Sequence, residues 1–377
     1  MSIVEISKNA LSHNIKLFRK IIGPKTVLGV SVKANAYGHG LIESSRIMLK
    51  SGADWLCVND IFEARLLRAA KINSPIYVMG YILKKDLEEA VMLKCRLIAY
   101  NKETVESVAL AARKLKTKAR LHLKIETGNY RQGIALEDIL DFAKYTLKFP
   151  EIIIEGIATH FANIEDGDPD HNSYARRQMK KFKAAIETLE AGGIHIPLQH
   201  CANSAATLLF PETHFSMVRT GIAAYGLWPS KEIKAAAKAH HPSYKLMPAL
   251  SWKSRIAQIK EVPKGESVGY GRAFYAARKM KIAIIPVGYY DGYDRGFSNK
   301  SDVLIRGKPA RVCGRVCMNI IMVDVTEIPD ARLEDKVTLI GKDGREEITA
   351  EYLAELIGTI NYEITTRISE SIPRIIV

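Results

Sequence analysis

Cysteine is scarce in this chain of 377 residues, and its cysteines form no recognisable pairs. The paired CxxC units of structural zinc sites are absent, and an odd number of cysteines is atypical of a disulfide framework. We therefore expect reduced thiols and no metal site. The five cysteines are Cys57, Cys95, Cys201, Cys313 and Cys317.

Long apolar runs are also missing. The opening segment MSIVEISKNALSHNIK has no apolar run of signal-peptide length. No later segment reaches the roughly 18 uninterrupted apolar residues of a membrane-spanning helix. We therefore expect a cytoplasmic protein without a membrane partner.

Acidic residues are the minority charge: 41 Asp and Glu stand against 55 Lys and Arg, which gives a net charge of +14. Such a surplus would permit attraction to nucleic acid. The basic residues are, however, spread along helical patterns such as residues 176–190. There we expect Met179, Phe182, Ile186 and Leu189 to form the buried stripe while the basic side chains face water. The pattern favours no nucleic-acid partner.

The overall composition, 47% hydrophobic and 25% charged, is that of a globular protein. Because 377 residues exceed what one hydrophobic core usually organises, we expect two domains. The alternating pattern runs to about residue 227 and the texture changes from about Leu246, so we assign residues 1–240 to the first domain and residues 241–377 to the second. We allow about the first ten residues to pack with the second domain.

The first domain alternates short apolar runs with longer helical patterns. This rhythm is typical of parallel strands joined by crossover helices, and eight such strands closing on themselves form a (β/α)8 barrel of the TIM type. The eight runs are TVLGVSVKA, WLCVND, PIYVMGY, RLIAYN, RLHLKIETG, EGIATHFAN, PLQHCANS and MVRTGIAAYG.

The second domain has frequent Gly and Pro and closely spaced apolar runs such as KIAIIPVGYYDG and DVLIRGKPARVCG. Short strands in quick succession predict a mostly antiparallel β domain. The segment SKEIKAAAKAHHPSYKL, residues 230–246, is basic and poor in large apolar residues, which favours an exposed connection.

A lysine, Lys33, stands at the end of the first apolar run, in VKANAYGHG. In barrels of this kind the reacting groups come from the C-terminal ends of the strands. We expect Lys33 to be the last residue of its strand, where two interpretations are open. Its side chain extends into solvent from an apolar stem, or it is desolvated and nucleophilic enough to bind an aldehyde cofactor.

A hydroxyl and small residues follow the last two strands. The seventh run ends at Asn203-Ser204, and the eighth carries Arg219 followed by Gly221-Ile222. Phosphate groups often bind after strands seven and eight of a barrel, where hydroxyl groups and backbone amides receive them. The plainer alternatives are that Ser204 caps a helix and that Gly221 serves packing.

Eight motifs run in order from one end of the chain to the other: VKANAYGHG (32–40), THFAN (159–163), NSA (203–205), VRTGIAAYG (218–226), SVGYGRAF (267–274), PVGYYDGY (286–293), GRVCMN (314–319) and INYEI (360–364). Together they resemble the alanine racemase family. The resemblance implies a pyridoxal-phosphate enzyme with an N-terminal (β/α)8 barrel and a C-terminal β domain, usually a head-to-tail homodimer.

The resemblance also implies how the cofactor is held. Lys33 would bind its aldehyde, and Arg219 would lie against its pyridine nitrogen. Because arginine stays protonated and cannot give its proton to the ring, the ring is a weaker electron sink, which favours racemisation over decarboxylation or transamination. The residues that would surround the phosphate are Tyr37, Ser204, Gly221, Ile222 and Tyr362.

Inversion of a carbon centre requires a proton removed from one face and returned on the other. The resemblance assigns these two steps to Lys33 and to Tyr270 of the second domain. His160, linked in the family to this tyrosine and to Arg219, is the candidate that tunes Tyr270.

The remaining implied roles concern the substrate and a partner subunit. Arg131 would meet the substrate carboxylate, and Lys124 aligns with a lysine that is often carbamylated to orient this arginine. Tyr270, Tyr289 and Met318 would reach the cofactor from the partner subunit, so a monomer should be poorly active.

The sequence departs from the usual family pattern at the periphery of these motifs. The family usually has aspartate at Glu126, methionine at Asn129, proline at Thr220, alanine at Tyr290 and aspartate at Asn319. We expect alanine as the substrate, with D-alanine serving cell-wall synthesis, and keep serine or a broader set of amino acids as the alternative.

Two rival classes use the same barrel. A barrel-type amino-acid decarboxylase generally places a carboxylate at the pyridine nitrogen, where this sequence has Arg219. A non-catalytic pyridoxal-phosphate carrier would lack the second domain and Tyr270.

Overall fold

The computed structural model describes residues 2–164 and 173–377, and its contacts divide the chain into two units. Asn9–Ala36 and Leu41–Pro248 form one, which we call the barrel unit. Met1–Lys8, Tyr37–Gly40 and Ala249–Val377 form the other, the β unit.

Eight parallel strands form the sheet of the barrel unit, in the order β8-β7-β6-β5-β4-β3-β2-β9. Between β8 and β9 the ring is completed by backbone hydrogen bonds from Ser216 N to Gln199 O (3.3 Å) and from Arg219 N to Ala202 O (2.9 Å). The predicted (β/α)8 barrel is therefore confirmed. Its strands are β2 (Val27–Ser31), β3 (Trp55–Val58), β4 (Ile76–Val78), β5 (Arg96–Ala99), β6 (Ala119–Lys124), β7 (Ile152–Ala158), β8 (Leu198–His200) and β9 (Met217–Thr220).

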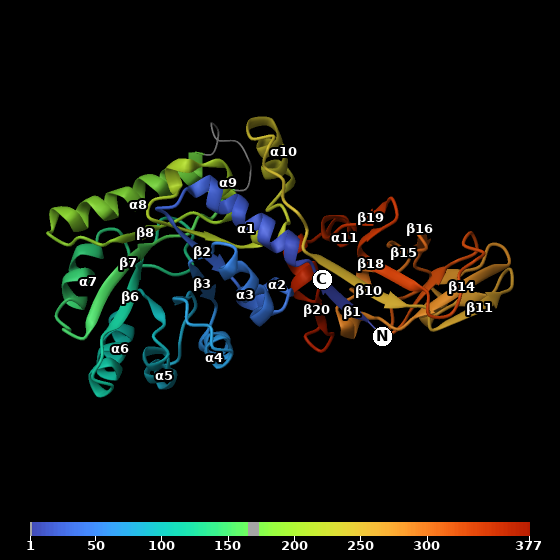
Figure 1. The fold of residues 1–377 in the computed structure, drawn as a ribbon, viewed down its shortest axis with the longest axis horizontal. Helices are drawn as coiled ribbons and strands as arrows, with labels where there is room; N and C mark the ends of the chain where they lie inside the picture. Colours follow the sequence, from blue (N-terminus) through green and yellow to red (C-terminus); the bar gives the residue numbers. More distant parts are fainter. Residues whose placement is uncertain (1, 165–172) are drawn as a thin grey trace. The chain divides into compact units, whose positions relative to one another are not determined.

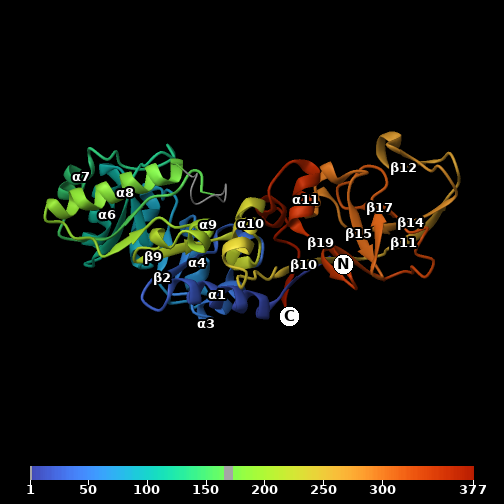
Figure 2. The ribbon, with the colours of Figure 1, turned by 90° about the horizontal axis from the view of Figure 1, so that it is seen from above.

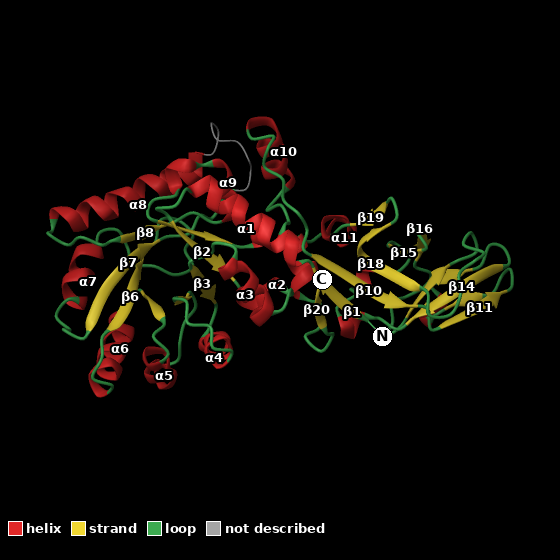
Figure 3. Cartoon of the chain, viewed as in Figure 1, coloured by secondary structure: helices red, strands yellow, loops and turns green. Residues whose placement is uncertain are grey.

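Helices α4 to α8 lie outside the strands in Figures 1 and 3. Several begin at a residue whose side chain accepts a first-turn N–H, such as Asp60 before α4 and Asn101 before α6. No helix within the described residues is both long and apolar enough to cross a membrane. The helices of the barrel unit are α1 (Lys8–Ile22, mostly in this unit), α3 (Leu41–Lys50), α4 (Ile61–Ala69), α5 (Leu87–Met92), α6 (Lys102–Lys114), α7 (Ile139–Thr146), α8 (Ser173–Ala191), α9 (Ser204–Leu209) and α10 (Lys231–His240).

Two sequence-based expectations about helices need correction. On α8, Phe182 and Leu189 are buried as predicted, but Met179 and Ile186 are only half-buried because the buried face is completed by Ala175, Gln178 and Ala185. The basic segment 230–246 is not merely a connection. It contains α10, whose first turn is capped by the Ser230 hydroxyl.

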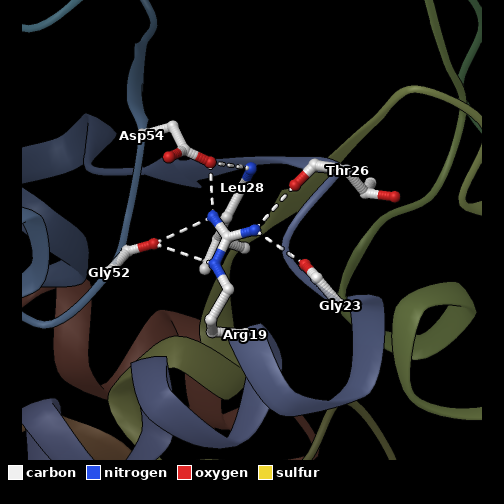
Figure 4. A network of polar contacts seen from close by, with 6 residues as sticks. All are labelled: Arg19, Gly23, Thr26, Leu28, Gly52 and Asp54. Carbon is white, nitrogen blue, oxygen red and sulfur yellow. Dashed lines mark hydrogen bonds and ion pairs between the residues drawn. The ribbon is translucent and has the colours of Figure 1, made fainter.

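Arg19 ties the start of the barrel together (Figure 4). From α1, its guanidinium donates to the carbonyl oxygens of Gly23 (2.9 Å) and Thr26 (2.7 Å), before β2, and Gly52 (2.9 Å), before β3. It also pairs with Asp54, whose carboxylate accepts from Leu28 N at 2.7 Å. One side chain thus fixes the entry of the first two barrel strands.

The β unit is mostly antiparallel, as predicted. Its larger sheet has the order β16-β15-β18-β10-β1-β20, with β19 paired to β18 (Figure 1). A second sheet is formed by β11-β14-β17, which are labelled in Figure 2. The chain's first strand pairs antiparallel with β10 and parallel with β20. The strands are β1 (Ile3–Ile6), β10 (Leu250–Arg255), β11 (Gln258–Val262), β12 (Ser267–Val268), β13 (Phe274–Tyr275), β14 (Met280–Ile285), β15 (Asp302–Ile305), β16 (Lys308–Arg311), β17 (Ile321–Asp324), β18 (Lys336–Asp343), β19 (Glu346–Ile348) and β20 (Arg374–Ile376), and the helices are α11 (Ala350–Ile357) and α12 (Asn361–Thr366).

Candidate active site

Lys33 lies just beyond the carboxyl end of β2, two residues after Ser31, rather than being the last strand residue as the sequence had predicted. It opens a turn in which Ala34, Asn35 and Ala36 all have φ near +53°. A left-handed backbone costs a non-glycine residue roughly 1–2 kcal/mol, so surrounding contacts must hold the turn. One of these contacts is Glu63 of α4.

The Glu63 carboxylate joins this turn to the loop after β3. It accepts hydrogen bonds from Ala34 N at 2.6 Å and from Asn59 N at 2.8 Å. Burial raises the pKa of Glu63, although these two backbone hydrogen bonds oppose the shift. Glu63 was not among the predicted site residues, because a lone glutamate on a helix carries no motif.

The electrostatic surroundings of Lys33 make its amine less basic. Burial lowers the pKa of Lys33, and the positive charge of Arg131 lowers it further, whereas Glu63 acts in the opposite direction. A larger neutral fraction makes a lysine amine a better nucleophile. Arg131, a predicted site residue, is thus part of the electrostatic environment of Lys33.

A carboxylate organises the loop that carries Arg131. Glu126 accepts a hydrogen bond from Gly128 N at 2.5 Å. Burial would raise the pKa of Glu126, but hydrogen bonding from successive backbone N–H groups, that of Arg131 included, lowers it overall. The Tyr174 hydroxyl of α8 donates to Gly128 O at 2.6 Å and fixes the loop from the other side.

Lys124 and His160 bring two more titratable groups into the barrel mouth. Burial, followed by Arg219 and Arg131, lowers the pKa of Lys124 well below its usual range. Burial and the charges of Lys124 and Arg219 do the same to the pKa of His160. The barrel therefore gathers the basic side chains of Lys33, Lys124, Arg131, His160 and Arg219 into one site, in which burial and the guanidinium charges favour the neutral forms of Lys124 and His160.

Arg219 lies near the end of β9 and is held in place by hydrogen bonds that both of its η nitrogens donate. Nη1 donates to His200 O at 3.0 Å and contacts His200 Nδ1, and Nη2 donates to Thr159 O at 2.7 Å. All hydrogen bonds of this side chain to described residues come from the η nitrogens, so Nε–H is the donor available to another acceptor.

Ser204, Gly221 and Ile222 meet at the carboxyl ends of β8 and β9. The Ser204 hydroxyl accepts from Gly221 N at 2.8 Å and from Ala223 N at 3.4 Å. Asn203, rather than Ser204, caps α9 through its side chain, which accepts from Ala206 N. The plainer alternative of a capping role for Ser204 is thus wrong.

A polar pocket of about 230 Å³ opens between the loops after β6, β7 and β8. It is lined by Asn129, Arg131, His160, Phe161, Ala162, Ile164 and Asn203. Within the described part of the chain, no group of three or more His, Cys, Asp or Glu side chains is arranged to hold a metal ion. The pocket therefore offers cationic and amide groups to an anionic molecule.

The other five predicted site residues belong to the β unit. The rings of Tyr37 and Tyr362 lie 6.0 Å apart. Tyr289 N donates to Cys317 O and Tyr290 N to Met318 O, so the segments of Tyr289 and Met318 lie side by side. The side chain of Tyr270 is 72% exposed in the single chain, and those of Tyr289 and Met318 are also exposed.

Fold and site together define a two-domain barrel enzyme whose site is built from basic side chains around a lysine. Models of the alanine racemase N-terminal and C-terminal domains match residues 6–229 and 249–376. The alanine racemase of Leptospira interrogans is 42% identical over 376 residues, covering 99% of this chain and 95% of the relative. That of Methanococcus maripaludis is 40% identical over 372 residues, covering 98% and 97%.

Solved structures agree with these relatives. Alanine racemase from Bacillus anthracis with bound L-Ala-P superposes with a TM-score of 0.92 at 35% identity, covering 100% of this chain and 95% of that one. The Clostridium difficile enzyme in complex with cycloserine gives a TM-score of 0.90 at 32% identity, with the same coverage. The chain belongs to the alanine racemase family and is an isomerase acting on amino acids.

Proposed function

We propose that this chain interconverts L-alanine and D-alanine, with pyridoxal phosphate bound at Lys33. The observation that carries the proposal is the setting of Lys33, whose pKa is lowered by burial and by Arg131 at the mouth of the barrel. An amine in this state is suited to bind an aldehyde. When bound, pyridoxal phosphate supplies an electron sink that makes the Cα proton of an amino acid acidic.

The residues present fit this cofactor. The Nε–H of Arg219 suits an acceptor such as a ring nitrogen, because the η nitrogens are already engaged. The Ser204 hydroxyl accepts from Gly221 N, so its own proton remains for a phosphate, which in this proposal lies beside the backbone amides of Gly221 and Ile222. Tyr37 and Tyr362, whose rings are neighbours, complete the phosphate site in this proposal.

Two bases on opposite faces of Cα carry out the inversion. Lys33 moves the proton on one face and Tyr270 on the other, with His160 tuning Tyr270. Arg131 binds the substrate carboxylate, and a carbamylated Lys124 orients Arg131. Tyr270, Tyr289 and Met318 enter from the partner subunit of a homodimer.

Alanine is the favoured substrate, and D-alanine supplies cell-wall synthesis. The solved Bacillus anthracis relative is described with L-Ala-P, which fits this choice. Serine is the alternative, because the amide of Asn129 lines the polar pocket beside Arg131 and could meet a side-chain hydroxyl.

The test combines covalent trapping with chiral analysis. Borohydride reduction of the purified protein followed by peptide mapping should find the cofactor on Lys33. The wild type should form D-alanine from L-alanine faster than D-serine from L-serine. Lys33→Ala should abolish both reactions, and the exposed-surface variant Lys50→Ala should abolish neither. Inversion that survives Lys33→Ala, or cofactor trapped on another lysine, would contradict the proposal.

Tyr270 is tested in the same assay. Tyr270→Phe removes only the hydroxyl, so the cofactor should still be trapped on Lys33 while racemisation falls by about 100-fold or more, the range of a lost acid–base group. Wild-type rates in this variant would exclude Tyr270 as the second base.

A further inference from the structure

The interior of the barrel unit contains a chain of polar side chains that runs from Arg219 to Glu155. Arg219 Nη1 contacts His200 Nδ1, His200 Nε2 lies 2.7 Å from His122 Nδ1, and His122 Nε2 lies 3.3 Å from a Glu155 carboxylate oxygen. Both histidines are completely buried. The chain thus connects a residue of the candidate site to an acidic residue on β7.

The direction of the hydrogen bonds follows from the first member. A guanidinium only donates, so His200 Nδ1 must accept and the proton of His200 must be on Nε2. Nε2–H then donates to His122 Nδ1, which places the proton of His122 on its Nε2, where it donates to Glu155. Every member therefore has one allowed protonation state.

The surroundings oppose any other state. Burial, with the positive charge of Arg219 added, lowers the pKa of both imidazoles, and for His122 this outweighs Glu155. The ring of Tyr77 packs on both, with its centroid 4.7 Å from that of His122 and 5.5 Å from that of His200. The imidazoles are therefore held neutral, and the Tyr77 ring packs against both of them.

The far end of the chain is a fixed negative charge. The Glu155 carboxylate accepts from Arg96 Nε at 3.1 Å and pairs with Arg120 Nε at 2.9 Å. Burial would raise the pKa of Glu155, but its hydrogen bond to His122 and the charge of Arg96 lower it. An anion here orients both imidazole dipoles with their acceptor ends toward Arg219.

The backbone is shaped to admit His122. This residue pairs with Gly156 of β7, and the register of the two strands shifts between Leu121 and His122. A Cβ added to Gly156 would come within 2.3 Å of His122 Nδ1. The glycine in the run EGIATH is thus required for the ring to lie against the strand.

We infer that His122 and Glu155 are positioning residues for Arg219, acting through His200. The inference rests on the proposed function in one respect, namely that Arg219 faces the cofactor ring. Through this chain, the Glu155 carboxylate on β7 keeps the guanidinium of Arg219 oriented and keeps His200 in the tautomer whose Nδ1 accepts from Arg219.

Nitrogen NMR of cofactor-free protein labelled on the histidine rings tests the chain without any need for activity. His122 and His200, assigned with His122→Phe and His200→Phe, should both be neutral Nε2–H tautomers at neutral pH. A protonated imidazole or an Nδ1–H tautomer at either position would overturn the inference, whatever the enzyme does with alanine.

Kinetics and cofactor binding test the positioning role. Glu155→Gln keeps the shape of the side chain and removes the charge, so kcat should fall about tenfold with KM changed less than about twofold, since a displaced catalytic group costs up to about 100-fold. Glu151→Gln, which breaks the Arg113 ion pair just before β7, is the matched control and should leave kcat unchanged. An unchanged kcat in Glu155→Gln would reduce the chain to a structural role.

His122→Phe keeps an aromatic ring but breaks the chain of hydrogen bonds. If Glu155→Gln does not fold, the same fall in kcat is expected in His122→Phe, and an unchanged kcat there would reduce the chain to a structural role. If the wild type proves unable to racemise alanine, the proposed function fails separately. In that case the test measures the dissociation constant of pyridoxal phosphate instead of kcat. This constant should rise about tenfold in Glu155→Gln because Arg219 loses its orientation. An unchanged constant would overturn the inference.

Discussion

Lys33 stands between charges of opposite sign, and the balance sets its proton affinity. Arg131 lowers the pKa of Lys33 and Glu63 raises it, on top of the lowering caused by burial. Only the neutral amine attacks an aldehyde, so the pH at which cofactor-free protein takes up pyridoxal phosphate half-maximally reports this pKa. Below that midpoint the amine is protonated, and above it uptake is fast.

Removing either neighbour should move this midpoint in a direction fixed by its charge. Glu63→Gln removes a negative charge that favours the ammonium form, so the midpoint should move to lower pH. Arg131→Gln removes a positive charge and should move it to higher pH. Glu43→Gln, an exposed ion-pair residue of α3, should leave it in place. Shifts of the same sign in the first two variants would show that Lys33 is not governed by these charges.

Glu126 shows how one side chain prepares a substrate residue. Hydrogen bonds from the loop backbone lower the pKa of Glu126. The ionised carboxylate therefore stabilises the folded loop fully at pH values above the usual carboxyl pKa, and this stabilisation is lost as the pH falls through the lowered pKa. Glu126→Gln removes the charge, so the loop of Arg131 should loosen and KM for alanine should rise by about fivefold or more, with kcat less affected.

The conservative change provides the control for this prediction. Glu126→Asp introduces the residue that the family usually has here and should keep KM within about twofold of wild type, since the carboxylate remains. Steady-state kinetics above and below the usual carboxyl pKa measure both variants. Equal KM values for the Gln variant and the wild type would show that the carboxylate does not order Arg131.

At the scale of elements, α8 links two loops of the site through one amide. Gln178 donates to Thr127 Oγ1 (3.1 Å) and His160 O (3.2 Å) and accepts from Ala162 N (2.8 Å). The residue is fully buried, and while Thr127 Oγ1 also bonds to Thr159 Oγ1 at 2.7 Å, His160 O and Ala162 N rely on Gln178. The helix therefore holds the loop after β6 and the loop after β7 in fixed positions relative to each other.

Gln178→Leu keeps the volume but removes these hydrogen bonds. Because buried partners would be left unsatisfied, the free energy of unfolding should fall by about 2–4 kcal/mol. Thr188→Val, an exposed hydroxyl of the same helix that bonds to its own turn, should cost less than about 0.5 kcal/mol. Urea unfolding followed by circular dichroism compares them, and similar losses in both variants would contradict a special role for Gln178.

The elements themselves were readable from the sequence because each barrel strand is a short apolar run between helical patterns. Each of the eight predicted runs overlaps one strand of the barrel, although β7 begins at Ile152, three residues before its run. The helix α10 was missed, since its buried side rests on only Ile233 and Ala237, too few apolar residues to form a visible stripe. On α8 the buried face includes a glutamine and alanines, which a search for large apolar residues passes over.

The sequence predicted the site residues that belong to motifs. It did not predict the residues that contact and orient them from other elements. Lys33, Arg131, His160 and Arg219 gather at one mouth because each follows or ends a strand. The missed residues act through hydrogen bonds to other elements, and a single sequence does not show which elements are neighbours. They are Glu63, Gln178, His122 and Glu155. The alternation of His122 and Lys124 on one face of β6 was the available signal, because residues two apart point to the same side of a strand.

At the scale of the whole molecule, the sequence and the contacts divide the chain differently in detail. The sequence places the boundary at residue 240 and allows about the first ten residues to pack with the second domain. The contacts place Met1–Lys8 in the β unit, begin its main part at Ala249 and add the turn Tyr37–Gly40, which the sequence did not indicate. The reason is local: β1 pairs between β10 and β20, and Gly38 packs so closely on α12 that an added Cβ would lie 2.0 Å from Thr365 O. Chain order alone does not contain such pairings.

In the proposed homodimer each active site is shared between two subunits. This sharing predicts that two inactive variants restore activity when mixed, which a site within one chain would not allow. In the proposed homodimer, Lys33 and Tyr270 of one site come from different subunits, and Tyr270 is largely exposed in the single chain. Lys33→Ala and Tyr270→Phe should each be nearly inactive alone. A hybrid dimer of the two would collect both defects in one site and leave the other intact.

Unfolding and refolding an equal mixture of the two variants should therefore restore activity. Random pairing in a twofold dimer makes half of the dimers hybrid, each with one intact site, so about a quarter of the wild-type activity per mass of protein is expected. Refolding each variant alone is the control. If both groups of a site came from one chain, the hybrid would hold no intact site, and the mixture would stay as inactive as its parts.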